Sequence, residues 1–214
     1  MVILPGMKRT ITVVGAGAVT AAPDIATVNV GVQVQAANAQ DALRRANELT
    51  SAVLDAVRGV GVTDNDLRTN GPHLWPNDRG YQCGNDISVV VRDVSLTGPV
   101  VDAAAGAGGP SFTISGVSFG VADPAAMQTL ARQAAIANAH AVATELATAA
   151  GAAVGDVLTI VEGTAGGTPR PMMMAEMRSA KAATPVATGE QTVRVDVTVT
   201  YRLVDAVGEA APSA

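Results

Sequence analysis

Ile25-Ala-Thr-Val-Asn-Val-Gly-Val-Gln-Val-Gln35 is the stretch that decides the fold of this 214-residue chain. Valine occupies every second position from Val28 to Val34, with polar or small residues between. A β-strand has a period of two, so this pattern predicts a half-buried strand with one apolar and one polar face. Residues 192–203 show the same alternation near the other end of the chain. Together the two stretches predict an antiparallel or mixed sheet with one solvated side.

Two long helices are expected beside these strands. Apolar residues recur at helical spacing after Asn38, which suits an N-cap, and Gly59 ends that pattern. Asp123-Pro124 begins an alanine-rich helix that runs to Ala150. A short helix at 97–107 and further strands are interleaved with them; the strands are expected at 10–19, 67–74, 81–92, 112–121 and 156–162. The expected fold class is α+β: an antiparallel or mixed sheet, built from strand-helix units, with two long helices packed on it.

The pattern predicts one main domain, 10–204, between an N-terminal extension at 1–9 and a C-terminal tail at 205–214. A segment at 164–189, inserted before the last strand, contains three prolines and shows no sustained periodicity. Connections longer than about 12–15 residues are uncommon in compact domains and are usually functional or disordered.

Composition narrows the class of protein. The chain is 48% hydrophobic but only 2% aromatic, and its 14 basic and 19 acidic residues give a formal charge of -5. Nucleic acid is therefore not an expected partner, since both the charge and the scarcity of aromatic rings oppose it. A single cysteine, Cys83, excludes an intramolecular disulfide and leaves at most a link between two subunits.

Targeting signals are also weak. The short apolar run at 1–9 stops at Pro5 and does not resemble a signal peptide, which predicts a cytoplasmic location if no leader is missing from the chain as given. No run approaches the roughly 20 apolar residues of a membrane-spanning helix.

Two glycine motifs resemble binding or catalytic signatures. Gly15 and Gly17 resemble the start of a dinucleotide-binding turn, but Pro23 breaks the helix that should follow. We expect these glycines to curve a strand or to permit close packing. Gly116-Val-Ser118-Phe-Gly120 matches the nucleophile elbow G-x-S-x-G, yet the only downstream histidine, His140, lies inside the long helix. Ser118 is expected to be an ordinary strand residue.

No metal, cofactor or catalytic residue is predicted. The two histidines and the single cysteine lack metal-ligand spacing. Asp64-Asn-Asp66 begins like a calcium loop, but Arg68 occupies the third ligand position, so a solvated turn is expected.

Methionines cluster in the long segment before the last strand, at Met172, Met173, Met174 and Met177. Thioethers form adaptable apolar contact surfaces, and they also bind Cu(I) or react with oxidants. We interpret the cluster as a contact surface; the alternatives are a disordered segment without a role, copper binding and peroxide scavenging.

Several segments match a known family in order and spacing; they are residues 11–17, 23–26, 61–62, 66–69, 80–81, 85, 89–93, 101–102, 116–119, 131–132, 134 and 189–193. Over residues 10–204 the chain resembles the SIMPL-domain family of periplasmic immunogenic protein-like and YggE-like bacterial proteins. The resemblance implies an α+β fold, a periplasmic or cell-envelope location and an association with stress tolerance. In some members it implies a large ring- or channel-like homo-oligomer. It supplies no catalytic residue, and the methionine cluster is not part of it.

The function expected from these observations is that of a non-enzymatic, self-assembling SIMPL-domain protein with a scaffold or stress-protection role. Its main partner is another copy of itself, with envelope association, and no cofactor is expected. The predicted oligomer contacts are the four methionines together with Ala134, Ala137 and Ala141 on the long helix. Exposed strand edges and low charge density favour such contacts.

The alternative is a small-molecule-binding protein or hydrolase with a cleft near Tyr81, Asp93 and Ser118. A concave pocket that holds Ser118 or His73 beside a carboxylate would favour this alternative.

Overall fold

The structure is a computed structural model that describes residues 9–163 and 189–205. The described residues form two compact units, each with its own hydrophobic core. Unit 1 contains 9–21, 123–163 and 191–205, and unit 2 contains 22–122 and 189–190.

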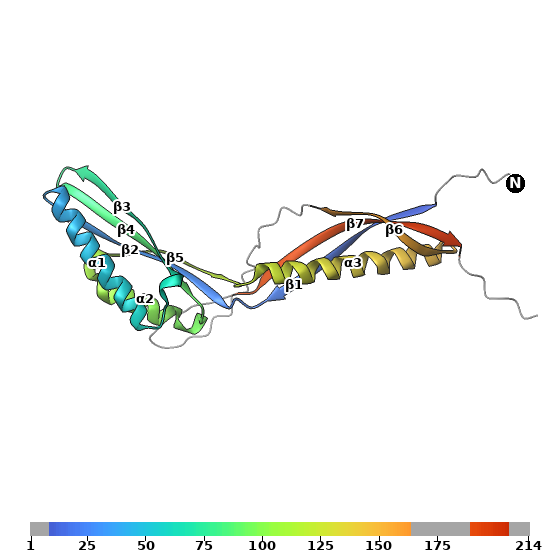
Figure 1. Cartoon of the computed structure of the whole chain (residues 1–214), viewed down its shortest axis with the longest axis horizontal. Helices are drawn as coiled ribbons and strands as arrows, with labels where there is room; N and C mark the ends of the chain where they lie inside the picture. Colours follow the sequence, from blue (N-terminus) through green and yellow to red (C-terminus); the bar gives the residue numbers. More distant parts are fainter. Residues whose placement is uncertain (1–8, 164–188, 206–214) are drawn as a thin grey trace, which may run out of the picture. The chain divides into compact units, whose positions relative to one another are not determined.

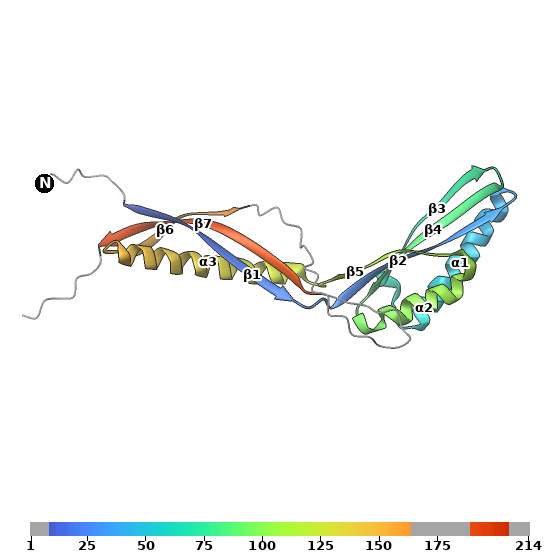
Figure 2. The same ribbon diagram turned by 180° about the vertical axis from the view of Figure 1, so that it is seen from behind.

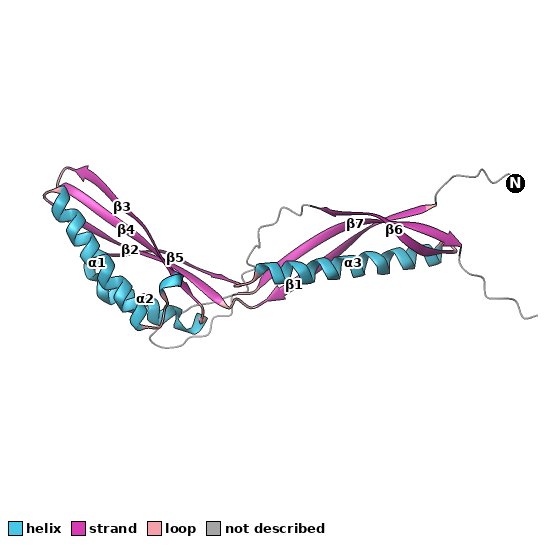
Figure 3. Cartoon of the chain, viewed as in Figure 1, coloured by secondary structure: helices cyan, strands magenta, loops and turns pink. Residues whose placement is uncertain are grey.

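Unit 2 is a four-stranded antiparallel sheet in the order β3-β4-β2-β5, with two helices on one face (Figure 1). Its strands are β2 (Ile25–Ala36), β3 (Leu67–Asn77), β4 (Gly80–Val91) and β5 (Phe112–Gly120). Its helices are α1 (Ala39–Gly59) and α2 (Thr97–Gly108), with short 3-10 turns η1 (Asp64–Asp66), η2 (Val94–Leu96) and η3 (Gly109–Ser111). The helices cover one side of the sheet, and no described element covers the other, which we call the outer face (Figure 3).

The alternating valines of β2 form the centre of the unit 2 core. Val28, Val30 and Val32 are fully buried against the two helices, where they meet Val53 and Val57 of α1. The polar residues between them lie on the outer face, as the period of two requires. The predicted half-buried strand is therefore confirmed.

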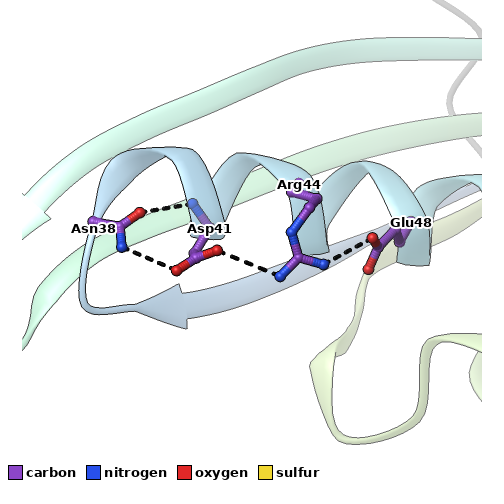
Figure 4. Close-up of polar contacts among 4 residues, drawn as sticks. All are labelled: Asn38, Asp41, Arg44 and Glu48. Atoms are coloured by element: carbon purple, nitrogen blue, oxygen red, sulfur yellow. Dashed lines mark hydrogen bonds and ion pairs between the residues drawn. The ribbon is translucent and has the colours of Figure 1, made fainter.

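Helix α1 begins where the sequence predicts. The side-chain oxygen of Asn38 accepts a hydrogen bond from the backbone N–H of Asp41 at 2.9 Å, and its amide donates to the Asp41 carboxylate at 2.9 Å (Figure 4). Arg44 then joins Asp41 to Glu48 along the exposed side of the helix. The hydrogen bond from Asn38, followed by that from Arg44, lowers the pKa of Asp41. This polar chain completes the first turns of α1.

Unit 1 is a three-stranded antiparallel sheet in the order β1-β7-β6, with one long helix on one face (Figure 1). Its elements are β1 (Thr10–Ala21), α3 (Pro124–Ala149), β6 (Ala152–Gly163) and β7 (Gln191–Asp205). Strand β1 pairs with β7 along its whole length, from Thr10 opposite Arg202 to Ala21 opposite Gln191. The face away from α3 is solvated and carries threonine pairs across these two strands.

Close approach between α3 and β1 explains the small residues in both elements. Alanines at every fourth position of α3 are 0–1% exposed; they are Ala131, Ala135, Ala139, Ala143 and Ala147. A Cβ added to Gly15 or Gly17 would overlap the carbonyl oxygens of Ala135 and Ala131. The spacing of four exceeds the 3.6 residues of a helical turn, so the line of contact winds around α3, as twisted strands require. Figure 2 shows α3 lying along β1 and β7 from behind.

The structure confirms the α+β class and adds a division into two sheets, each with its own helices. The span 10–204 expected as one domain contains both units. The inserted segment 164–189 lies outside the described residues except for Gly189, as do 1–8 of the N-terminal extension and 206–214 of the tail.

Candidate functional site

Strand β6 is an edge strand with apolar side chains on both faces. No described strand pairs with its outer edge. Four of its large apolar side chains are between 38% and 60% exposed; they are Val157, Leu158, Ile160 and Val161. Sequence reasoning expected a strand here but did not single out these residues. The sequence did contain a signal for them. Residues 157–161 are a run of mostly β-branched residues without lysine or proline, and such a run at a sheet edge favours pairing with another chain.

The faces of these side chains follow from the register with β7. Ile160 lies opposite Val199 on the side that carries α3, whereas Val161 lies opposite Thr198 on the other side. Both are more than half exposed. Both surfaces of the strand are therefore available for contact. We call Val157, Leu158, Ile160 and Val161 the β6 cluster.

Helix α3 presents the predicted alanine contacts to solvent. Ala134, Ala137 and Ala141 are exposed, while the alanines of the buried row pack on β1. The exposed side also carries Leu130 and Leu146, 53% and 50% accessible. The small residues of α3 were expected to let another backbone approach closely. Within the chain, that backbone is β1, which packs on the buried row of alanines. Whether the exposed alanines contact another copy stays a prediction.

The edges of this sheet differ. In β1 the backbone N–H of Ala16 donates to the side-chain oxygen of Asn138 from α3 at 3.0 Å. This contact occupies a donor that a neighbouring strand would otherwise use. On the β6 side, Arg132 of α3 pairs with Glu162 at 3.0 Å, near the end of the strand. The register of β6 with β7 is irregular between Val154 and Thr159, so the regular part of this edge is the stretch that carries Ile160 and Val161.

Two other sequence-predicted contact features have different outcomes. The methionines Met172, Met173, Met174 and Met177 lie outside the described residues. Cys83 is fully buried in unit 2 beside Val34 and Ala46, and burial raises the pKa of its thiol. The link between two subunits that a single cysteine leaves open is therefore not available to Cys83 in this fold, because its sulfur is buried.

The residues of the alternative cleft do not come together. Tyr81 is near the start of β4, and Asp93 follows its end, where the Asp93 carboxylate caps Ser95. The length of a strand separates them, roughly 35–40 Å at 3.3 Å per residue. Ser118 lies on β5 opposite Thr27 and is an ordinary strand residue, as expected.

His73 does lie beside a carboxylate, in a shallow concavity on the outer face of unit 2. Its Nε2 is 3.8 Å from Oδ2 of Asp86, longer than a hydrogen bond. The concavity has a volume of about 170 Å³ and is lined by Gln33, His73, Trp75, Gly84, Asp86 and Thr113. We call it the outer hollow. Ser118 does not line it.

The turn at Asp64–Asp66 is a structural feature rather than a calcium loop. Asp66 accepts hydrogen bonds from Arg92 at 2.7 and 2.9 Å and from Thr63 at 2.9 Å. The hydrogen bonds from Arg92 are the main cause that lowers the pKa of Asp66, while burial opposes them. The predicted solvated turn is therefore wrong for Asp66, which is buried and paired.

The described part of the chain contains no group of three or more His, Cys, Asp or Glu side chains placed to hold a metal. Within the same ranges, no helix is both long and apolar enough to cross a bilayer.

The chain thus forms two helix-covered antiparallel sheets, and the segment that forms unit 2 is inserted in the sequence between β1 and α3 of unit 1. Residues 11–201 match the profile of the SIMPL family, a protein family of unknown function (DUF541). The chain belongs to this family.

Relatives are found in several bacteria. The 26 kDa periplasmic immunogenic protein of Brucella melitensis is 34% identical over 218 residues, covering 90% of this chain and 84% of the relative, and that of Brucella abortus gives the same values. The uncharacterized protein YggE of Escherichia coli is 31% identical over 185 residues, covering 82% of this chain and 73% of the relative. The Brucella name places that relative in the periplasm.

Proposed function

We propose that this protein is a non-enzymatic SIMPL protein that assembles with copies of itself through the β6 cluster, with a scaffold or stress-protection role in the periplasm or cell envelope. The exposed edge of β6 is the observation that carries the proposal. The periplasmic name of the Brucella relative supports the location. The ring- or channel-like form and the stress role rest on the family resemblance.

Contact at β6 supplies free energy through burial. A partner surface placed over β6 covers four apolar side chains that are now substantially exposed, and a partner strand would in addition receive backbone hydrogen bonds from the edge. Complete burial of one such side chain is worth about 1.5–3 kcal/mol, so covering the exposed portion contributes roughly 1 kcal/mol each.

The partner of β6 decides the form of the assembly. If β6 pairs with β6 of a second copy about a twofold axis, the interface is used up and a dimer results. If β6 contacts a different surface, such as the exposed side of α3 around Ala137, the same contact repeats from copy to copy; it closes a ring where the rotation between copies returns to the first one and continues as a filament where it does not. We propose the second arrangement, because α3 offers exposed alanines and leucines in the same unit.

Native mass measured by light scattering at several concentrations tests the proposal. We expect a discrete mass of more than two copies of the 21.4 kDa chain, unchanged by reductant. Val161→Lys should lower this mass, because a lysine ammonium in the β6 cluster would have to be buried in the contact at a high desolvation cost. Val204→Lys is the matched control, since Val204 is 41% exposed at the end of the central strand β7, and it should leave the mass unchanged.

The measured masses distinguish the dimer, the ring-like assembly and a monomer. If the unmodified chain is a dimer and Val161→Lys makes it a monomer, β6 pairs with β6 of a second copy and the proposed ring is wrong. A monomer for the unmodified chain contradicts self-assembly altogether. If Ala137→Glu leaves a large native mass unchanged, the α3 contact is wrong even where the β6 contact holds.

The stress role has a separate test. In an Escherichia coli strain that lacks YggE, we expect the unmodified chain to improve survival under peroxide, and the Val161→Lys variant to do so less than the Val204→Lys variant. Equal protection by both variants would show that stress protection does not depend on assembly through β6.

A further inference from the structure

Gly84 lines the outer hollow in unit 2, and Gly31 lies beside two other residues that line it, Asp86 and Thr113. Gly84 of β4 lies opposite His73 on one side and Gln33 on the other, and Gly31 of β2 lies opposite Asp86 and Thr113. A Cβ added to Gly31 would lie 3.0 Å from Oγ1 of Thr113 and 3.1 Å from Oδ1 of Asp86. The missing side chain is what lets these two polar groups converge above the sheet. Glycine inside a strand often marks the close approach of a ligand.

A β-bulge brings the aromatic residues to this face. Asn70 lies opposite Asp86 and His73 lies opposite Gly84, so Gly71 and Pro72 together face the single residue Asn85. The extra residue reverses the sides of β3. Before the bulge the even-numbered residues lie on the outer face, and after it His73 and Trp75 do.

The bulge is held in place from the helical side. The buried amide of Asn85 donates a hydrogen bond at 2.9 Å to the hydroxyl of Thr50 in α1. A Cβ on Gly71 would approach the side-chain oxygen of the same asparagine to 2.9 Å, so the bulge packs directly against it. The position of Trp75 is thus set by the fold rather than by a mobile turn.

The chemistry of the walls favours a cation. Asp86 is the only acid that lines the hollow, and no lysine or arginine lines it. The Asp86 carboxylate receives no hydrogen bond from any described side chain, since His73 remains at 3.8 Å. Trp75 is 40% exposed, and the tip of its indole ring reaches over Gly84. A carboxylate beside an exposed indole is the combination that binds an ammonium group.

We propose that the outer hollow binds the ammonium head of a small organic amine, with Asp86 as the counter-ion and Trp75 as the aromatic surface. The volume of about 170 Å³ is smaller than the roughly 300–1,000 Å³ of pockets that enclose a drug-sized ligand. It holds a head group, and the remainder of the ligand extends into solvent. This site is independent of self-assembly through β6.

Intrinsic fluorescence tests the site directly, because Trp75 is the only tryptophan in the chain. Full-length protein is titrated with choline chloride at constant ionic strength. The matched neutral probe is 3,3-dimethylbutan-1-ol, which has the shape of choline without its charge. We expect saturable binding of choline with a millimolar dissociation constant, as is typical of exposed cation–π contacts, and no saturation with the neutral probe.

Two variants assign the response to the hollow. Asp86→Asn should weaken choline binding about tenfold, because it removes the counter-ion. Asp78→Asn removes the same charge from the exposed β3–β4 turn, roughly 20 Å along β4 from Asp86, and should bind choline as the unmodified chain does. Gly84→Val fills the hollow with a residue that strands tolerate, and it should abolish binding.

Three results would overturn the proposal. They are a fluorescence response to choline that does not saturate, equal responses to both probes, and unchanged choline binding in both Asp86→Asn and Gly84→Val. Methyl glucoside serves as a third, uncharged probe. If it saturates the fluorescence response and choline does not, the hollow binds a neutral polyol and the proposal is contradicted. Light scattering on the same samples keeps the result separate from assembly, since a monomer that binds choline supports this site and contradicts only the proposed function.

Discussion

Single residues decide how closely the elements of unit 1 approach. Gly17 in β1 lies under α3, where an added Cβ would overlap the carbonyl oxygen of Ala131. The obstacle is backbone, which has no alternative rotamer to adopt, so the helix itself would have to move. The glycines that resemble a nucleotide-binding turn therefore allow close packing of α3 on β1. This agrees with the expectation from Pro23, which breaks the helix that such a turn requires.

Gly17→Ala should lower the free energy of unfolding of unit 1 by about 2–3 kcal/mol, because the core cannot relax around a methyl group pressed on a helix backbone. Urea titration followed by circular dichroism measures the change. Gly163→Ala is the control in β6, where the nearest atom would be 3.4 Å away, and it should alter stability by no more than about 0.5 kcal/mol. Equal effects of both substitutions would show that the α3–β1 contact is not close.

Between elements, an ion pair matters more where at least one of its charges is shielded from water. Asp66 in η1 is buried and bonded to Arg92, which follows the end of β4 and whose own side chain is 68% exposed. This contact joins the turn after α1 to the sheet. The exposed pairs on α1, such as Arg44 with Glu48, are open to solvent and contribute little.

Asp66→Asn should therefore lower the urea midpoint of unit 2 at pH 7. Because the pKa of Asp66 is lower in the folded state than its unfolded value of about 3.9, the carboxylate stabilises the fold above that value. This contribution is lost as pH falls through the folded pKa, so the difference between the unmodified chain and the variant should shrink below about pH 4.

The exposed Asp78 provides the control for that titration, because Asp78→Asn changes the same charge without removing a described ion pair. A midpoint difference for Asp66→Asn that persists undiminished in acid would mean that shape, not charge, causes the destabilisation.

The whole molecule combines one unit made of a continuous chain segment with one made of separated segments. Among the described residues, all strands and helices of unit 2 lie between 22 and 122, whereas β1, α3 and β7 of unit 1 come from both sides of it. The unit 2 core of valines and Ile87 is complete within that segment.

A fragment of residues 22–122 should fold on its own. We expect a cooperative thermal transition by circular dichroism and dispersed amide signals by nuclear magnetic resonance, since about 100 residues can bury a sufficient core. The fragment with Val53→Ala, which opens a cavity in that core, is the comparison and should be destabilised by about 1–3 kcal/mol. A fragment without a transition would show that unit 2 depends on the rest of the chain.

Local patterns in the sequence determined the type and position of most elements. The alternating valines of β2, the cap at Asn38 and the Asp123-Pro124 helix start were each predicted correctly, because period and capping depend on neighbours within a few residues.

Tertiary structure alone decided which elements share a sheet and which side chains meet. Pairing of Thr10 with Arg202 joins residues almost a whole chain apart, and no local pattern specifies it. The same holds for the exposed edge of β6 and for the bulge that turns Trp75 toward Asp86. Each depends on contacts between distant segments, and a one-residue change of register moves every side chain of a strand to the opposite face.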